Sequence, residues 1–196
     1  AVKQYCKVTP ASLRKRHEPV GQVPTLTLFL PYRPPYQWQQ VRTFLQQRAV
    51  AGTETVTDNT YWRCLGDADG GGYVLAQHRP DRHGFAVTVS VDNLHFTHKV
   101  IASLSRVLDL HADPQAIRHA LKNAGIPDTL IAEGLRLPGC WSAFEAGCRA
   151  ILGQQVSVKA AINKVATLTH ELGEVTSLGI AFPCAESVAE SELTFL

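Results

Sequence analysis

Residues 134–161 read GLRLPGCWSAFEAGCRAILGQQVSVKAA, and this stretch decides how the rest of the chain is interpreted. Phe144, Cys148 and Ile151 recur at helical spacing, and Gly153 is placed to end their helix. A second apolar helix begins near Val158. The break between them, Gly153–Ser157, holds two consecutive glutamines, which packing alone does not explain. The stretch therefore predicts two helices joined by an exposed polar turn with a role outside the core.

Helical periodicity extends over the whole second half of the chain. From His98 onward the apolar residues recur about every 3.6 positions, beginning with Val100, Ile101, Leu104, Val107 and Leu108. Asp113 is a candidate N-cap before Pro114, and we expect the inward face of that helix to be Ile117, Ala120 and Leu121. With Ser157 as N-cap, a long helix follows whose apolar face includes Val158, Ile162, Val165, Leu168 and Leu172. Residues 183–192 start another.

Before His98 the apolar period is two, which indicates half-buried strands. Strands are expected over 26–30, 61–65, 73–78 and 85–91, with a hairpin loop at Asp67–Gly72 and one helix from about Trp38 to Ala49. The predicted fold class is therefore α+β. Residues 23–98 form an antiparallel sheet with helices, and residues 99–196 form a helical domain that is incomplete at its C-terminal end.

Composition narrows the class of protein without naming it. A hydrophobic content of 45% and a charged content of 18% are typical of a globular chain, and no apolar run is long enough to predict a membrane span. The net charge of +2 is weak support for a nucleic-acid partner, although a local basic patch is compatible with it. Scattered cysteines predict free thiols in a reducing compartment, with Cys140 and Cys148 as small buried hydrophobes. His95 and His98 lack the partners of a metal site.

The two ends of the chain predict a piece of a longer protein. The 196 residues contain no methionine and finish on the apolar run Leu193–Leu196. Near the start, Tyr5–Pro10 and Leu13–Arg16 resemble the end of an AraC-like helix-turn-helix domain, and a basic solvated linker explains them equally well. Residues 1–22 are therefore assigned to the end of such a domain or to a linker.

An ordered set of segments resembles the 3-methyladenine DNA glycosylase II family of the helix-hairpin-helix superfamily. The segments run in order with similar spacing, and they are Tyr32–Trp38, Phe44–Val50, Glu54–Val56, Arg106–Leu110 and Leu135–Cys140. The resemblance implies a sheet domain like half of the TATA-binding protein, followed by a helical glycosylase domain. It also implies a bacterial cytoplasmic enzyme, in some bacteria fused to a regulator, that flips alkylated purines out of double-stranded DNA and excises them hydrolytically in base excision repair. The resemblance implies no metal or cofactor.

The same resemblance makes Gly153–Ser157 a wedge loop, which fills the space that a flipped base leaves in the DNA stack. In the resembled family a leucine stands where this chain has Gln155. Glutamine fills the gap less hydrophobically, but its amide can hydrogen-bond the orphaned partner base. Gln154, Val156 and Lys159 are assigned to DNA contact with it. The alternative is that both glutamines are polar residues of a solvent-exposed turn.

Phe44 matches an aromatic residue that, in the resembled family, lines the pocket for the flipped base. An electron-deficient alkylated purine stacks well on an aromatic ring. The alternative is a core residue, because Phe44 lies on an amphipathic helix beside Val41 and Leu45. Tyr61, Trp62 and Trp141 are interpreted as packing residues.

No catalytic residue is assigned. The resemblance implies an aspartate after a Gly-rich hairpin, but no such hairpin is visible and the last aspartate, Asp128, precedes the helix pair. The chain by itself is therefore expected to be inactive and to self-associate through its uncovered helix face, which includes Val158 and Val165. Two other functions stay open: a non-catalytic DNA-binding or alkylation-response regulatory module, and an interaction scaffold whose sheet binds protein.

Overall fold

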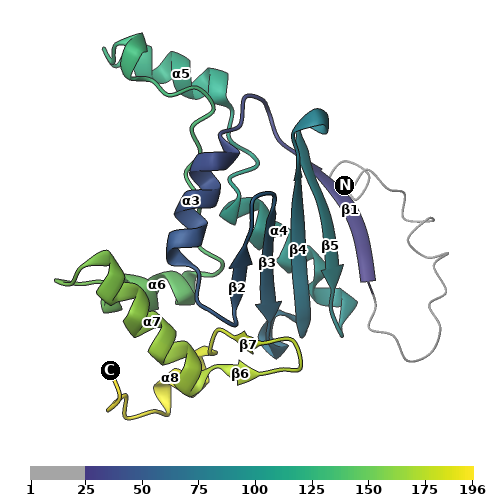
Figure 1. Cartoon of the computed structure of the whole chain (residues 1–196), viewed down its shortest axis with the longest axis vertical. Coiled ribbons are helices and arrows are strands. Elements are labelled where there is room, and N and C mark those ends of the chain that lie inside the picture. Colours follow the sequence, from purple (N-terminus) through teal and green to yellow (C-terminus); the bar gives the residue numbers. More distant parts are fainter. Residues whose placement is uncertain (1–24) are drawn as a thin grey trace.

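The computed structural model describes residues 25–196, so the assignment of residues 1–22 lies outside the described part. Its centre is a five-stranded antiparallel sheet of strand order β1-β5-β4-β3-β2 (Figure 1). The strands are β1 (Thr25–Pro31), β2 (Glu54–Val56), β3 (Thr60–Leu65), β4 (Gly72–Arg79) and β5 (Gly84–Ser90). The α+β fold class is confirmed, and β2 is a strand that the sequence pattern did not predict.

Alternation along the strands gives the sheet one buried face. Leu28 of β1 lies opposite Val87 of β5, and Leu30 lies opposite Phe85. All four side chains are buried, because residues two apart on a strand point to the same side. The predicted hairpin at Asp67–Gly72 joins β3 to β4 and includes a short 3-10 turn.

Two helices cover the buried face. They are α3 (Trp38–Arg48), which begins and ends where the sequence predicts, and α4 (Thr97–Val107), which lies behind the sheet in Figure 1. Val41, Leu45, Val100 and Leu104 join the strand residues in one hydrophobic core. The α4 helix spans the predicted boundary at residue 98 and packs on the sheet. The division into residues 23–98 and 99–196 therefore stays a prediction.

The later helices are α5 (Pro114–Asn123), α6 (Ala143–Leu152), α7 (Val158–Leu172) and α8 (Ala185–Ala189). Asp113 and Ser157 cap α5 and α7 as predicted, and Ser142 caps α6. Between α7 and α8 lies a small hairpin of β6 (Glu174–Val175) and β7 (Ile180–Ala181). Strands of two residues are too short to leave a period in the sequence, so this hairpin was not predicted.

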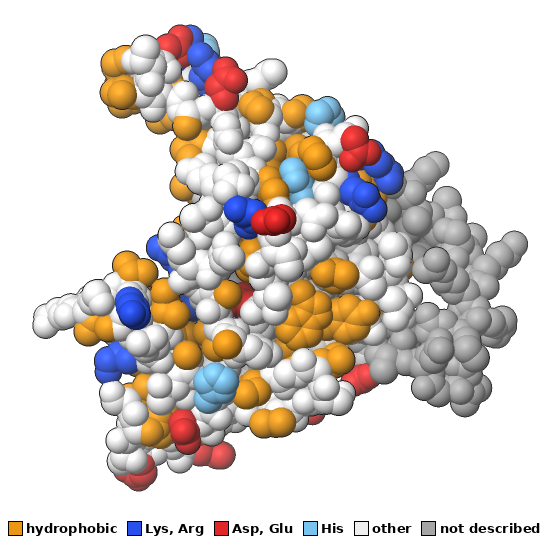
Figure 2. All heavy atoms as spheres, in the orientation of Figure 1, with side chains coloured by type: hydrophobic (Ala, Val, Ile, Leu, Met, Phe, Trp, Pro, Cys, Tyr) orange, Lys and Arg blue, Asp and Glu red, His pale blue; other side chains and the backbone are white. Residues whose placement is uncertain are grey.

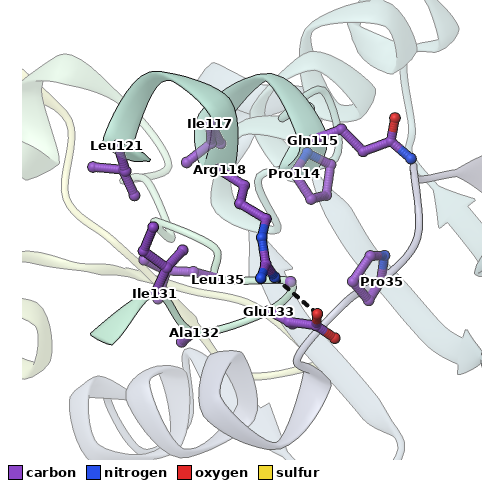
Figure 3. Close-up of a pocket in the computed structure, with 11 residues that line it drawn as sticks. Pro35, Pro114, Gln115, Ile117, Arg118, Leu121, Ile131, Ala132, Glu133 and Leu135 are labelled. Atoms are coloured by element: carbon purple, nitrogen blue, oxygen red, sulfur yellow. Dashed lines mark hydrogen bonds and ion pairs between the residues drawn. The ribbon is translucent and has the colours of Figure 1, made fainter. Parts of the chain in front are cut away.

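The expectation that Ile117, Ala120 and Leu121 face inward is wrong. No residue of α5 is buried, and the helix projects from the rest of the molecule as an arm (Figure 1). Ile117 and Leu121 line a hollow of about 210 Å³ with Ile131, beside the ion pair of Arg118 and Glu133 (Figure 3). Periodicity identifies the apolar side of a helix, but it does not supply a segment to cover that side.

Several packing predictions have mixed outcomes. Trp141 and Tyr61 are buried packing residues, as expected. Val165 was expected to be uncovered, but it is buried. Cys140 was expected to be buried, but it is exposed, because it lies in the extended segment before α6 rather than on a helix. Within residues 25–196, no helix is both long and apolar enough to cross a membrane.

Candidate nucleic-acid interface

The predicted wedge loop, Gly153–Ser157, is held at both ends by hydrogen bonds to the flanking helices. The N–H of Gly153 donates to the Arg149 carbonyl oxygen at 3.0 Å, which closes the last turn of α6. The Gln154 side-chain amide folds back and donates to the Ala150 carbonyl at 3.0 Å. The Ser157 hydroxyl accepts from the N–H of Ala160 at 3.3 Å and caps α7. These bonds fix the loop between two helices.

Gln155 occupies the left-handed region of the backbone, with φ of 57°. A residue with a Cβ adopts this region infrequently, and the conformation costs about 1–2 kcal/mol. Its side chain is exposed, and none of the hydrogen bonds among residues 25–196 involves that side chain. The sequence placed an exposed polar turn here. The sequence did not predict the positive φ of Gln155, which sets the direction in which its side chain leaves the backbone.

The surroundings of the loop are apolar and basic rather than uniformly polar. Ile151, Val156 and Val158 are 74%, 38% and 59% exposed. Lys159 is also exposed and forms no ion pair among the described residues. Figure 2 shows hydrophobic and basic side chains together on the lobe that α6 and α7 form at the left. Lys164, farther along α7, donates to the carbonyl of Leu196 at 2.7 Å.

Phe44 lies on the wall of a cavity of about 330 Å³ between the sheet domain and α6. It packs against the edge of the main core and is only half-buried. The guanidinium of Arg48 lies over its ring, 3.8 Å from the ring centroid. The cavity, called here the α3–α6 pocket, is lined by Phe44, Leu45, Arg48, Glu54, Arg63, Val107, Pro138, Gly139, Cys140, Trp141, Glu145, Ala146, Arg149 and Ala150.

A buried ion network crosses the floor of the α3–α6 pocket. Arg63 of β3 donates to Glu145 of α6 at 2.6 Å and to Glu54 of β2 at 2.9 Å. Arg149 completes the network, 2.7 Å from Glu145 and 3.4 Å from Glu54. The side chains of Arg63 and Glu145 are each 3% exposed. Charges this deeply buried are tolerated when they are paired and hydrogen-bonded, as these are.

The network shifts the pKa values of Glu145, Arg63 and Tyr61. Burial raises the pKa of Glu145, but the Arg63 and Arg149 guanidiniums outweigh that effect, and the pKa lies below its ordinary value. Burial lowers the pKa of Arg63, but the carboxylates of Glu145 and Glu54 reverse that effect, and the pKa lies above its ordinary value. For Tyr61, burial and the Glu54 carboxylate raise the pKa together. Glu145 and Arg63 are therefore both charged near neutral pH.

Sequence reasoning missed this network, although two signals were present. Arg63 lies between Trp62 and Cys64 in a strand with a buried face, where a charge requires a partner. Glu145 stands three residues after Ser142, the spacing of a capping box. The Ser142 hydroxyl accepts from the Glu145 N–H, but the Glu145 carboxylate bonds Arg63 instead of capping the helix.

One helix connects the two groups of predicted site residues. The first turns of α6 contribute Glu145 and Arg149 to the α3–α6 pocket, and the end of α6 leads into the wedge loop with Gln154, Gln155 and Val156. Both carboxylates of the pocket are committed to ion pairs. Asp128, the last aspartate, lies beside α5 and pairs there with Arg118 and Lys122.

Known proteins match most of this chain. Residues 27–142 match the AlkA N-terminal domain family. DNA-3-methyladenine glycosylase 2 of Escherichia coli (strain K12) is 39% identical over 145 residues, which is 74% of this chain and 50% of that protein. The probable bifunctional transcriptional activator/DNA repair enzyme AlkA of Mycobacterium tuberculosis (strain CDC 1551 / Oshkosh) is 34% identical over 203 residues, covering 96% of this chain and 40% of that protein. The chain spans half or less of these relatives.

Solved structures share the fold at low sequence identity. The 3-methyladenine DNA-glycosylase from Archaeoglobus fulgidus has a TM-score of 0.63 and 17% identity, covering 82% of this chain and 57% of that one. The Clostridium acetobutylicum 8-oxoguanine glycosylase/lyase, solved with double-stranded DNA, has a TM-score of 0.55 and 15% identity, covering 84% and 54%. The family match over residues 27–142 and the sequence relatives show that the chain belongs to the AlkA N-terminal domain family and is homologous to DNA-3-methyladenine glycosylase 2.

Proposed function

We propose that this chain supplies the sheet domain and the base-flipping helices of a DNA glycosylase that excises alkylated purines of the 3-methyladenine type from double-stranded DNA in the bacterial cytoplasm. One observation carries the proposal: an exposed Gln155 in the left-handed conformation, at the turn between two capped helices, in a chain homologous to a DNA-3-methyladenine glycosylase. A strained and exposed residue at a fixed turn is a feature that functional sites retain.

In this proposal Gln155 is the wedge. Extracting a base from the stack costs a few kcal/mol, and a side chain that fills the gap offsets part of that cost. The side-chain amide of Gln155 both donates and accepts hydrogen bonds, so it can pair with a donor or an acceptor on the orphaned base. Val156 contributes apolar contact beside it, and Lys159 contacts a phosphate. Gln154 supports the loop through its bond to Ala150 and meets DNA through its backbone.

The flipped base enters the α3–α6 pocket, where Phe44 offers a ring face. The cavity of about 330 Å³ lies within the size range of small-ligand pockets. Hydrolysis of the glycosidic bond requires a carboxylate that is free to stabilise the sugar cation, and Glu54 and Glu145 are both held by arginines. We therefore assign no catalytic carboxylate in this pocket, and we expect this chain alone to release no base.

Two measurements on the purified chain test the proposal. The first is affinity for a duplex with one abasic-site analogue against an undamaged duplex. Tighter binding to the abasic duplex is expected, because no flipping cost remains. The second is base release from methylated DNA, with the Escherichia coli enzyme as positive control. Equal affinity for the two duplexes would contradict the proposed wedge, and it would favour a module that binds DNA without flipping a base. Base release by the chain would contradict the expectation that it is inactive by itself.

A further inference from the structure

The aromatic face in the α3–α6 pocket is already occupied by a cation. Arg48 is the last residue of α3, one helical turn after Phe44, and its guanidinium carbon lies 3.8 Å from the Phe44 ring centroid. The same guanidinium donates to the Phe44 carbonyl at 3.4 Å. Among residues 25–196, no carboxylate pairs with it. Arg48 is therefore held by the ring that a flipped base would use.

The charge balance of the pocket also identifies Arg48 as an unpaired cation. Three arginines and two glutamates line the cavity, which leaves one positive charge in excess. Arg63 and Arg149 share the carboxylates of Glu54 and Glu145, so the excess charge is that of Arg48. A second cation that entered this cavity would meet an unneutralised like charge at close range, where solvent screens it less than at the surface.

We propose that Arg48 sets the charge specificity of this pocket by competing with a cationic base for the ring of Phe44. The inference rests on the proposed base-binding role of Phe44. A cationic N-methylated purine stacks on Phe44 only after the half-exposed Arg48 side chain moves into solvent. An uncharged purine is not repelled by the charge of Arg48, so Arg48 hinders its binding only by occupying the ring. Arg48 therefore weakens binding of cationic purines selectively.

The test uses two nucleosides of nearly equal shape: 7-methylguanosine, which is cationic in mildly acidic buffer, and guanosine, which is neutral. Each is titrated into the 196-residue chain at pH 6 and low salt, and binding is followed by 1H–15N NMR. The proteins are wild type, Arg48→Gln, Arg48→Lys and Phe44→Leu. The matched control is Arg42→Gln, because Arg42 lies on the same helix but pairs with the exposed Asp58. The amide spectrum of each variant verifies its fold.

Arg48→Gln is expected to tighten 7-methylguanosine binding by about fivefold and guanosine binding by less than about twofold, a difference that shrinks at high salt. Arg48→Lys keeps the charge and should resemble wild type for 7-methylguanosine. Equal tightening for both nucleosides, or weaker binding of either by Arg48→Gln, overturns the inference while leaving the pocket assignment intact. Unchanged binding of both nucleosides by Phe44→Leu shows instead that the pocket assignment is wrong. Absence of binding by every variant overturns both.

Discussion

The α4 helix and the α5 helix have equally clear apolar patterns, and they end in opposite surroundings. Val100 and Leu104 of α4 are fully buried in the core under the sheet. On α5, Ile117 is 37% exposed and no residue is buried. The difference lies in what reaches each helix: α4 meets strands brought together from distant parts of the chain, whereas α5 meets the short segment that contains Ile131. An apolar face thus becomes a stabilising core only when another segment covers it.

The largest difference in stability between the core and the α5 arm is expected when an arginine is replaced in each. Arg63→Ala should lower the free energy of unfolding by about 3–5 kcal/mol, because it leaves Glu54 and Glu145 buried with reduced pairing. Arg118→Ala removes two ion pairs on the α5 arm that solvent screens, so it should leave the unfolding midpoint unchanged within error. Urea unfolding followed by tryptophan fluorescence measures both. Similar losses for the two variants would show that the arm is part of the cooperative core.

A second pair of variants compares a leucine in the core with a leucine on the α5 arm. Leu104→Ala should cost about 2–5 kcal/mol, because it opens a cavity in the core. Leu121→Ala should change stability by about 0.5 kcal/mol or less, since the side chain lines an open hollow. The same urea titrations report both values. A loss above about 2 kcal/mol for Leu121→Ala would mean that the arm is covered in solution.

The ion network also predicts a pH dependence. Because the folded pKa of Glu145 lies below its unfolded value, its stabilising effect is complete above the ordinary pKa and is lost as pH falls through the folded pKa. The stability difference between wild type and Glu145→Gln should therefore be large at pH 7 and shrink below about pH 4.3. Urea titrations across this range measure it. A difference that grows on acidification would contradict the ionised state of Glu145.

The sequence predicted the local features of the fold better than its tertiary contacts, and the reason is physical. Strands, helices and N-caps depend on residues close in sequence, so alternation gave the strands over 26–30 and 85–91, and Asp113 and Ser157 were found as caps. The partner of a buried charge depends on the tertiary fold. Arg136 was visible within a motif, but its burial and its bonds to the carbonyls of Ala112, Arg33 and Pro35 were not.

The same difference between local features and tertiary contacts applies to the candidate site. The exposed turn at Gly153–Ser157 was predicted from two glutamines between helices, because a turn is a local feature. The pocket around Phe44 required the contact of α3 with α6, and the stacking of Arg48 on Phe44 required side-chain positions. The assignments of Phe44, Gln154, Gln155, Val156 and Lys159 stay proposals.

Self-association tests whether the exposed apolar residues of the helical part behave as a patch. Ile151, Val156 and Val158 are exposed near the wedge loop, although Val165 is covered. Exposed apolar residues that lie together promote weak association. We expect the apparent mass by light scattering to rise with concentration, and Val158→Ser with Ile151→Ser to reduce the rise. A strictly monomeric chain at high concentration would count against this patch.

The account depends most directly on Gln155. Its exposed side chain contributes little to folding, so Gln155→Ala should unfold like wild type within about 0.5 kcal/mol. The measurement is the affinity of each variant for a duplex with one abasic-site analogue, together with its thermal unfolding. Gln155→Ala should bind this duplex more weakly, because the gap in the stack is left unfilled, and Gln155→Leu should bind at least as tightly as wild type. If Gln155→Ala binds like wild type while Lys159→Ala loses affinity, the loop is a solvated connector and the wedge assignment is wrong.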